Sequence, residues 1–568
     1  MLDSPSKTHR WELGIEHWSD PVDTSNPEIS DGLGNSLILP RTHRERVIPM
    51  NGFRRFIVVG LILLITTAAS AAINDPVKID TGLIAGASNA GSETRVFKGI
   101  PFAAPPVGPL RWRPPQPVAP WTGVRNTEQF GPRCMQGGVG TARGGSTPPP
   151  TSEDCLYLNV WTGAKSASER RPVIVFAYGG GFNSGAGSEP RYDGEALAKK
   201  GVVFVTYNYR LGVFGFFAHP ELTTESDHHA SGNYGLMDFI AALKWVQRNI
   251  AHFGGDPKRV TIMGESAGAF MVASLVGSPE AKGLFQRAIA ESGAWMGLGI
   301  GRMSPRGPAE ETGKKLGSLA ELRMKPADEM MRIGRSTGIL IDGWILPEDL
   351  SITFAQGRQN EVDLLVGSNQ DEGTFFAGGQ RGGGGGGGTN SAQQFIDQGR
   401  QRFGDMADLF LKLYPASSDA EASTSQLNRV RDEMAWHMRT WAKLQSMRGK
   451  SKAYWYYFTH VPPVAPGQTS RGATHTAELA YVFNNLLPPT LPWTDVDRKL
   501  ADTMSSYWAN FAASGDPNGK GLPVWPAFKE KTSERTMILG DKVEAASGLD
   551  MERVTFFDRA YAKAFPVK

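Results

Sequence analysis

Continuous apolar runs and amphipathic segments alternate along most of the chain from residue 77 onward. Residues 172–178 and 202–209 are apolar runs, typical of strands buried on both faces of a sheet. Residues 233–250 carry apolar side chains at helical spacing and predict an amphipathic helix. Further strands are predicted at 156–161, 288–290 and 363–366. This alternation predicts an α/β fold with a mostly parallel central sheet and helices on both faces.

Three later segments depart from this simple alternation. Residues 391–447 are helix-rich and are interpreted as a helical cap region over the functional site, and a helix is predicted at 503–511. Seven consecutive glycines at 382–388 cannot specify one conformation, so they predict a surface loop. We interpret this loop as a tolerated insertion rather than as the hinge of a lid.

An uncharged apolar run at 56–72 follows Arg54 and Arg55 and ends in small residues. With an Ala-x-Ala pattern at 69–71, this arrangement is typical of a secretory signal peptide. The run is short for a membrane span, so an uncleaved N-terminal anchor is the less favoured alternative. A twin-arginine export signal fits the flanking residues less well.

Met50 begins a segment that would be a complete signal by itself. The sequence therefore predicts a polar leader at 1–49, which we interpret as a start-site artefact, and a signal peptide at 50–72. A single domain is predicted at 73–568. The protein is expected to be secreted or periplasmic, with no stable membrane span in its mature form.

The charge of the chain is close to balanced. Its formal net charge is +3, and residues 1–55 contain seven Lys/Arg and eight Asp/Glu, so the remainder carries +4. An excess this small gives no support for a nucleic acid or an acidic polymer as partner.

The chain contains two cysteines, Cys134 and Cys155, which lie 21 residues apart. In an exported protein such a pair predicts one disulfide that closes a surface loop. Two unrelated buried thiols are the alternative. Zinc binding is set aside because no further ligands lie nearby in the sequence.

Residues 260–270 carry the strongest chemical signal in the chain. A β-branched run ends at Gly264, and Ser266 is followed by Gly268 and by small helix-forming residues. A serine in a strand-turn-helix arrangement of this kind has its hydroxyl held clear of the sheet, and the two glycines permit the sharp bend. Ser266 is therefore the candidate nucleophile.

The Gly-x-Ser-x-Gly pattern is weakly specific in a chain with 67 glycines. Residues 334–338 match it as well, with Ser336 at the centre, but the preceding residues 326–332 predict a polar helix rather than a buried strand. The structural context therefore favours Ser266 over Ser336.

Three glycines, at 179–181, directly follow the predicted strand at 172–178. Such a segment is either a flexible loop or a set of backbone amides open to an anion. Its position after a buried strand and before Ser266 favours an oxyanion hole.

A serine nucleophile needs a base, and the base needs an acid that orients it. His475 lies late in the chain on a glycine-containing loop, in the order serine, acid, histidine. The acid is expected after the strand at 363–366, where both Asp371 and Glu372 qualify and sequence physics cannot choose between them. The remaining histidines interpreted as structural are His219, His252, His437 and His460.

The chain resembles the type-B carboxylesterases, the α/β-hydrolase family that includes the cholinesterases. Residues 153–160 (Glu-Asp-Cys-Leu-Tyr-Leu-Asn-Val) and 264–268 match the two signatures of the family. Supporting motifs occur at 99–103, 208–212, 253–257 and 515–518. The resemblance covers nearly everything from residue 77 onward and implies an α/β-hydrolase fold.

The resemblance also implies roles for individual residues. The triad would be Ser266, Glu372 and His475, because the family's acid is the glutamate of an Asp-Glu-Gly motif. The amides of Gly180, Gly181 and Ala267 would form the oxyanion hole, and Cys134 would pair with Cys155.

The chain departs from the cholinesterases between the two cysteines. Those enzymes carry a tryptophan in this loop that binds a quaternary ammonium group, whereas residues 135–154 contain no aromatic residue. Choline-ester specificity is therefore not expected. Tyr178 replaces the histidine common before the triple glycine, a change that some relatives share.

These patterns predict a serine carboxylesterase that acts on a small-molecule ester through an acyl-enzyme and requires no metal or organic cofactor. Trp295 and Trp344 are interpreted either as walls of an apolar substrate pocket or as core residues. Cleavage of a carbamate, amide or lactone is an alternative, and a catalytically silent binding module on the same fold is a less favoured one.

Overall fold

The computed structural model describes residues 73, 75–88, 93–137, 147–377, 391–447, 450–529, 535–547 and 549–564. All of these belong to one of the two units into which the chain divides, residues 68–568. The predicted leader (1–49), the predicted signal peptide (50–72) and the seven-glycine run (382–388) lie outside the described residues. The first described residue is Ile73, with which the predicted domain begins.

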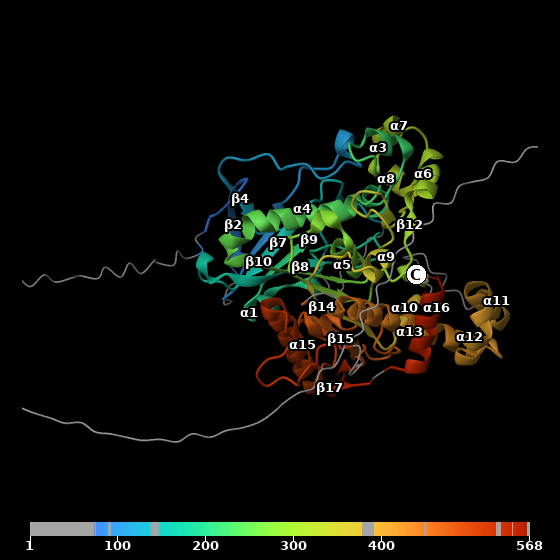
Figure 1. Cartoon of the computed structure of the whole chain (residues 1–568). Coiled ribbons are helices and arrows are strands. Elements are labelled where there is room, and N and C mark those ends of the chain that lie inside the picture. The colour runs from blue at the N-terminus through green and yellow to red at the C-terminus, as the bar shows by residue number, and fades with distance from the viewer. Residues whose placement is uncertain are drawn as a thin grey trace, which may run out of the picture. The chain divides into compact units, whose positions relative to one another are not determined.

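The described residues form a 13-stranded sheet, which runs through the molecule in Figure 1. Its centre is a block of neighbouring strands that are all parallel to one another. In sheet order these are β9 (Val203–Tyr207), β8 (Arg171–Ala177), β10 (Gly255–Glu265), β11 (Arg287–Glu291), β14 (Asp363–Asn369), β15 (Ala453–Phe458) and β16 (Thr536–Leu539).

Antiparallel strands complete the sheet on both sides of the parallel block. On one side these are β1 (Val77–Ile79), β2 (Gly82–Ser88), β3 (Arg95–Pro101) and β7 (Tyr157–Thr162), and β4 (Val124–Thr127) is added by a parallel pairing to β2. On the other side is β17 (Val543–Ala546).

Strands β8 and β9 are apolar over nearly their whole length because helices cover both faces of the sheet. Every residue of β9, and all of β8 after Arg171, is buried. Helix α4 (Tyr234–Asn249) lies on one face and α15 (Asp495–Ser514) on the other (Figure 1). The predicted mostly parallel sheet with helices on both faces is confirmed.

Helix α15 is longer than the sequence pattern at 503–511 predicts. Thr494 and Asp497 form a capping box in which each side chain binds the other residue's backbone N–H. This cap starts the helix eight residues before the apolar pattern is obvious, and Gly515, with φ +76°, ends it.

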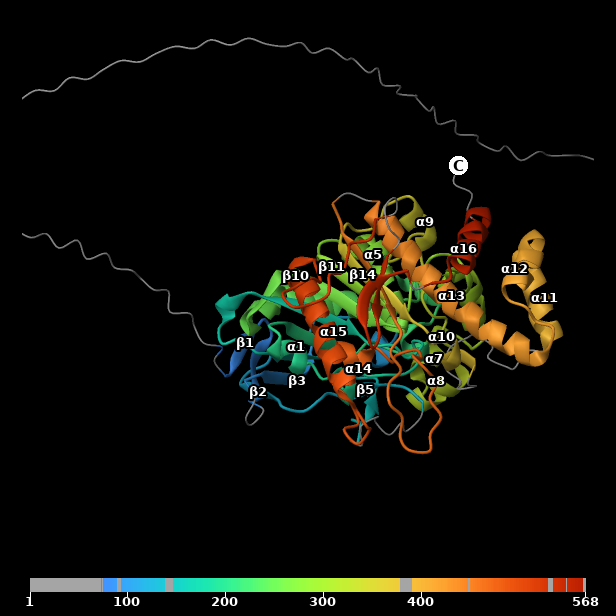
Figure 2. The same cartoon turned by 90° about the horizontal axis from the view of Figure 1, so that it is seen from below.

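The helix-rich segment 391–447 contains α11 (Ala392–Phe403), α12 (Ala407–Leu413) and the long α13 (Asp419–Ser446). Helix α13 packs against β14 and β15, and also against α10 (Glu372–Ala377). Figure 2 shows α11 and α12 beside one end of α13. This segment therefore supports the element that carries Glu372.

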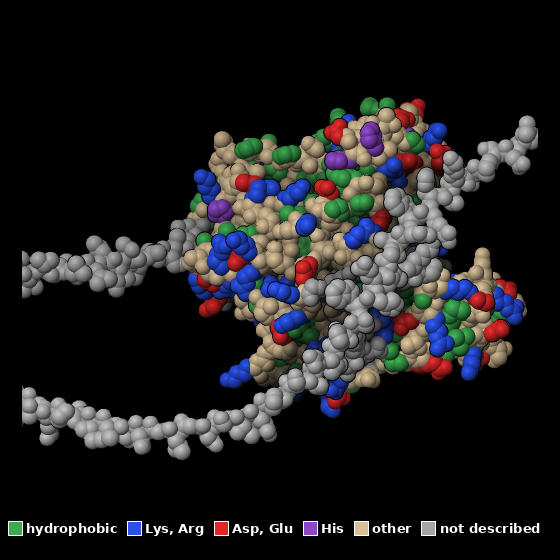
Figure 3. Space-filling model, viewed as in Figure 1, with side chains coloured by type: hydrophobic (Ala, Val, Ile, Leu, Met, Phe, Trp, Pro, Cys, Tyr) green, Lys and Arg blue, Asp and Glu red, His purple; other side chains and the backbone are tan. Residues whose placement is uncertain are grey.

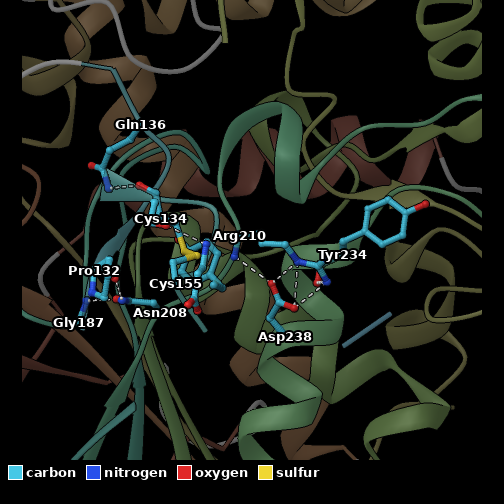
Figure 4. The surroundings of a disulfide bond; sticks show 12 residues. Pro132, Cys134, Gln136, Cys155, Gly187, Asn208, Arg210, Tyr234 and Asp238 are labelled. Atoms are coloured by element: carbon cyan, nitrogen blue, oxygen red, sulfur yellow. Dashed lines mark hydrogen bonds and ion pairs between the residues drawn. A yellow bond between two sulfur atoms is a disulfide. The ribbon is translucent and has the colours of Figure 1, made fainter. Parts of the chain in front are cut away.

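Cys134 and Cys155 form a disulfide, as predicted (Figure 4). Two short paired strands, β5 (Arg133–Cys134) and β6 (Thr151–Ser152), lie next to it. On a loop-entropy model, closing 21 residues in this way stabilises the fold by about 3 kcal/mol.

Basic and acidic side chains are interspersed on the face of the molecule seen in Figure 3, in keeping with the nearly balanced charge. Of the helices in the described part of the chain, none combines the length and the apolar character that crossing a membrane requires.

Candidate active site

Ser266 stands at the sharp turn between β10, which ends at Glu265, and α5 (Ala267–Gly277). Its backbone has φ 54° and ψ −121°, a region that residues with a side chain rarely adopt. The Ser266 N–H donates to the Glu291 carbonyl at the end of β11 (2.8 Å), which holds the turn against the sheet. The predicted strand-turn-helix context is confirmed.

The glycines on either side of Ser266 are required by close backbone contacts. A Cβ atom at position 264 would lie 2.3 Å from the Gly268 carbonyl oxygen. One at position 268 would lie 1.9 Å from the Ala177 carbonyl oxygen at the end of β8. The turn can therefore form only because both positions lack a side chain.

The second Gly-x-Ser-x-Gly match lies in a different context, as predicted. Ser336 follows α8 (Ala327–Ile333) rather than a strand, and its hydroxyl accepts a hydrogen bond from the Gly338 N–H (3.2 Å).

His475 and Glu372 are in direct contact, although 103 residues separate them in the chain. Nδ1 of His475 lies 2.6 Å from Oε2 of Glu372, and both side chains are buried. The other Glu372 oxygen, Oε1, accepts hydrogen bonds from the Ser292 hydroxyl (2.5 Å) and the Asn369 N–H (3.0 Å). Glu372 is thereby held in one orientation toward the imidazole.

The adjacent carboxylate, Asp371, has a different partner. Its Oδ2 accepts a hydrogen bond from the Ala473 N–H (2.8 Å), and its own N–H donates to the Ala473 carbonyl (3.0 Å). Asp371 therefore binds the backbone of the loop that carries His475, while Glu372 binds the imidazole.

Glu265 connects His475 to the serine turn. Its Oε1 lies 3.2 Å from Nε2 of His475, and it directly precedes Ser266 in the chain. The imidazole thus lies between Glu372 on its Nδ1 side and the end of β10 on its Nε2 side.

Several residues around this pair were not singled out from the sequence. They are Glu265, Ser292, Asn369 and Glu478, of which Asn369 donates a short hydrogen bond to Glu478. Glu265 is the last residue of a buried strand and Ser292 directly follows another, and this position at a strand end is the signal that could have identified them.

The carboxyl groups near His475 control its protonation. Burial by itself lowers the pKa of His475, but the negative charges of Glu372 and Glu265 outweigh it and raise the pKa to about 9. The value of about 6.5 for an unperturbed imidazole therefore does not apply here.

Three further carboxyl groups are shifted toward their neutral form. Burial raises the pKa of Glu265, partly offset by the charges of His475 and Arg191. Burial and the charge of Glu265 raise the pKa of Glu478 to about 8. Burial and the charge of Glu478 raise the pKa of Glu291 well above its ordinary range. Glu478 is thus expected to be mostly protonated at neutral pH.

The triple glycine lies against the serine turn. A Cβ atom at position 179 would lie 2.9 Å from the Ser266 Cβ atom, so the two backbones approach closely. Gly180 and Gly181 have φ +112° and +61°, and Ala267 is the first residue of α5. Gly180, Gly181 and Ala267 thus belong to two segments that meet at Ser266.

The residue before the triple glycine is held by a second tyrosine. The Tyr209 hydroxyl donates to the Tyr178 carbonyl (2.8 Å), and the two rings stack with centroids 4.6 Å apart. Arg210, the next residue, forms a buried ion pair with Asp238 of α4 (2.8 Å). These contacts therefore hold Tyr178, the residue from which the glycine segment begins, in a fixed position.

The two candidate pocket tryptophans have different surroundings. Trp295 is buried against Phe270 of α5, and its indole N–H donates to the Phe270 carbonyl (2.9 Å). Trp344 is half-buried and stacks on the His228 ring, with centroids 3.7 Å apart. Within the described ranges, no group of three or more His, Cys, Asp or Glu side chains is arranged to hold a metal ion.

A parallel sheet with a serine at the turn after a central strand defines an α/β-hydrolase. The model of the carboxylesterase family matches residues 74–557, and the chain belongs to this family. It is an enzyme of the carboxylesterase class, and this class hydrolyses ester bonds.

Its relatives include named esterases. The fumonisin B1 esterase of Sphingopyxis macrogoltabida is 38% identical over 480 residues, which cover 80% of this chain and 85% of the relative. The para-nitrobenzyl esterase of Bacillus subtilis (strain 168) is 35% identical over 477 residues, covering 80% and 93%. A solved PNB esterase structure superposes with a TM-score of 0.74 at 33% identity, covering 84% of this chain and 98% of that chain. The expected α/β-hydrolase fold is confirmed.

Proposed function

We propose that this carboxylesterase cleaves a small-molecule carboxylic ester with Ser266 as nucleophile, His475 as base and Glu372 as orienting acid. The observation that carries the proposal is the position of His475. One ring nitrogen is 2.6 Å from the buried Glu372 carboxylate, and the other faces the strand end that leads into Ser266. A serine hydrolase needs one ring nitrogen of its histidine on the acid and the other available to the serine, and this position of His475 supports the assignment.

In the first half of the reaction, Nε2 of His475 accepts the Ser266 hydroxyl proton as Oγ bonds to the ester carbonyl carbon. The resulting oxyanion is held by the amides of Gly180, Gly181 and Ala267. Each such donor contributes about 3 kcal/mol in comparable enzymes. The bond to the alcohol oxygen then breaks, and the alcohol leaves with the proton from His475.

In the second half, water replaces the alcohol. His475 takes a proton from the water as the water oxygen attacks the acyl carbon. The proton then passes to Oγ of Ser266 as the carboxylic acid product is released. The Glu372 carboxylate orients His475 and stabilises the imidazolium in both halves. No metal or organic cofactor takes part in the proposed cycle.

The substrate is proposed to be an ester other than a choline ester, because the loop closed by the disulfide offers no aromatic ring for a quaternary ammonium. Trp295, packed on the helix that begins after Ser266, and Trp344 are proposed as walls of its pocket. A carbamate, amide or lactone could enter the same mechanism. A binding module without catalysis is disfavoured because the serine, histidine and acid are all present.

Covalent labelling tests the proposal. The wild-type enzyme is expected to hydrolyse p-nitrophenyl acetate and to lose this activity on treatment with diisopropyl fluorophosphate, because the reagent phosphorylates an activated serine. Peptide mass spectrometry should place one adduct on Ser266. An adduct on another serine, or full activity after labelling, would contradict the assignment.

We also infer that the protein is exported, with a signal peptide at 50–72 and a mature single domain at 73–568. The disulfide is compatible with an oxidising compartment, whether periplasmic or extracellular. N-terminal sequencing of the exported product is expected to begin near Ala72 or Ile73. A product that retains residues before Met50 would overturn both the signal peptide and the start-site hypothesis.

A further inference from the structure

The segment 178–187, which carries the proposed oxyanion-hole glycines, contains no strand or helix. Its conformation therefore depends on hydrogen bonds within the segment and to other parts of the protein. The Asn183 N–H donates to the Gly180 carbonyl (3.1 Å), which closes a turn. The Gly212 N–H donates to the Phe182 carbonyl (2.7 Å) at the tip of that turn.

Gly185, where this segment turns back, is held by the side chain of Gln136. Its Nε2 donates to the Gly185 carbonyl (2.9 Å), and its Oε1 accepts from the Gly185 N–H (3.0 Å). The same Nε2 also donates to the Cys134 carbonyl (3.1 Å). The amide of Gln136 thus binds both backbone polar groups of Gly185, so Gly185 can neither shift nor rotate without breaking a hydrogen bond.

Gly185 lies directly on the start of the glycine segment. A Cβ atom at this position would be 2.6 Å from the Tyr178 ring and 2.8 Å from the Gly179 carbonyl oxygen. Gly179 in turn lies against Ser266, as described above. A displacement of Gly185 is therefore transmitted to the backbone beside the nucleophile, because these contacts leave no space to absorb it.

The disulfide fixes the backbone segment that carries Gln136. Gln136 lies two residues after Cys134, which is bonded to Cys155 (Figure 4). A parallel connection runs through Asn208, whose Nδ2 donates to the Pro132 carbonyl (2.9 Å) and whose Oδ1 accepts from the Gly187 N–H (3.0 Å). Figure 4 shows Pro132, Asn208 and Gly187 together on this side of the disulfide.

We propose that Gln136 is a positioning residue for the oxyanion hole, which it holds in place through Gly185. The Cys134–Cys155 disulfide makes the backbone that carries Gln136 rigid. The inference rests on the proposed function. The loop that begins at Cys134 thus stabilises the transition state by holding the backbone of the glycine segment. In the cholinesterases the corresponding loop instead contacts a cationic group of the substrate.

The test replaces Gln136 with methionine, which has a similar length and cannot make the two hydrogen bonds to Gly185. With p-nitrophenyl acetate, kcat of Gln136→Met is expected to fall by about 10- to 100-fold with KM changed less than about threefold, since a misplaced donor weakens the transition state selectively. The inhibition constant of a trifluoromethyl ketone, which forms a tetrahedral adduct with the serine, should rise by a similar factor.

Rates are divided by the concentration of serine that reacts with diisopropyl fluorophosphate, so that unfolded protein is not counted, and Gln136→Leu serves as a second variant. Gln116→Met is the matched control, because Gln116 is exposed and its side chain binds only the nearby Pro114 carbonyl. It is expected to behave as wild type.

An unchanged kcat per reactive site with a lowered unfolding temperature would reduce Gln136 to a structural role and overturn the inference. A rise in KM at constant kcat would also overturn it. A wild-type enzyme without ester turnover or serine labelling would instead overturn the proposed function, and the inference with it.

Discussion

Replacing Ser266 with alanine is expected to lower kcat for p-nitrophenyl acetate by about 10⁴- to 10⁶-fold, as loss of the nucleophile does in other serine hydrolases. Without Oγ no acyl-enzyme can form, and only the residual effect of the oxyanion hole on attack by water remains. Folding should be preserved, because the strained backbone at position 266 is set by Gly264 and Gly268 rather than by the hydroxyl. Steady-state kinetics and thermal unfolding of the same preparation measure both effects.

The chain contains its own control for this experiment. Ser336 lies in the second Gly-x-Ser-x-Gly match but follows a helix, so Ser336→Ala is expected to retain full activity. If Ser266→Ala were to keep more than a few per cent of wild-type kcat, the nucleophile would have to be sought elsewhere.

Replacing Glu372 with glutamine is expected to lower kcat by about 10³- to 10⁴-fold, a smaller loss than that from Ser266→Ala. The glutamine keeps the size of the side chain but removes the charge that stabilises the imidazolium of His475. It can also present an N–H to Nδ1 and so favour the wrong tautomer. The loss should appear in kcat, with KM changed little, because Glu372 is buried behind His475.

The pH profile gives this variant a second readout. In the wild type, kcat/KM should rise with pH toward about 9 and fall as pH drops, because protonated His475 cannot accept the serine proton and its pKa is raised to about 9. Glu372→Gln removes one of the charges that raise this pKa, so the midpoint of its acid limb should move to lower pH. Initial rates corrected for spontaneous ester hydrolysis are the measurement.

Asp371→Asn is the matched control for Glu372→Gln, since the two carboxylates are adjacent. An asparagine at 371 still accepts the hydrogen bond from the Ala473 N–H, so kcat is expected to fall by less than about 10-fold. A larger loss from Asp371→Asn than from Glu372→Gln would assign the acid to Asp371. A wild-type acid limb that is flat would argue against any histidine base.

The sequence by itself determined the features that depend on neighbours along the chain. The strand that leads into Ser266, the amphipathic helix that became α4 and the helix before Ser336 all follow from local patterns of apolar, glycine and polar residues. These patterns report burial and backbone geometry, so they also predicted the parallel sheet. The start of α15 was missed because a cap, rather than apolar periodicity, begins that helix.

The tertiary structure decided which side chains meet. Asp371 and Glu372 are equivalent as sequence, and only the packing of α10 next to the loop at 473–475 directs Glu372 to the imidazole and Asp371 to the backbone. The contact of Gln136 with Gly185 joins residues 49 positions apart in the chain. Such pairs leave no local pattern, because a hydrogen bond between distant segments depends on how the intervening chain folds. The sequence could therefore determine the elements that carry the site, and the fold alone determined its contacts.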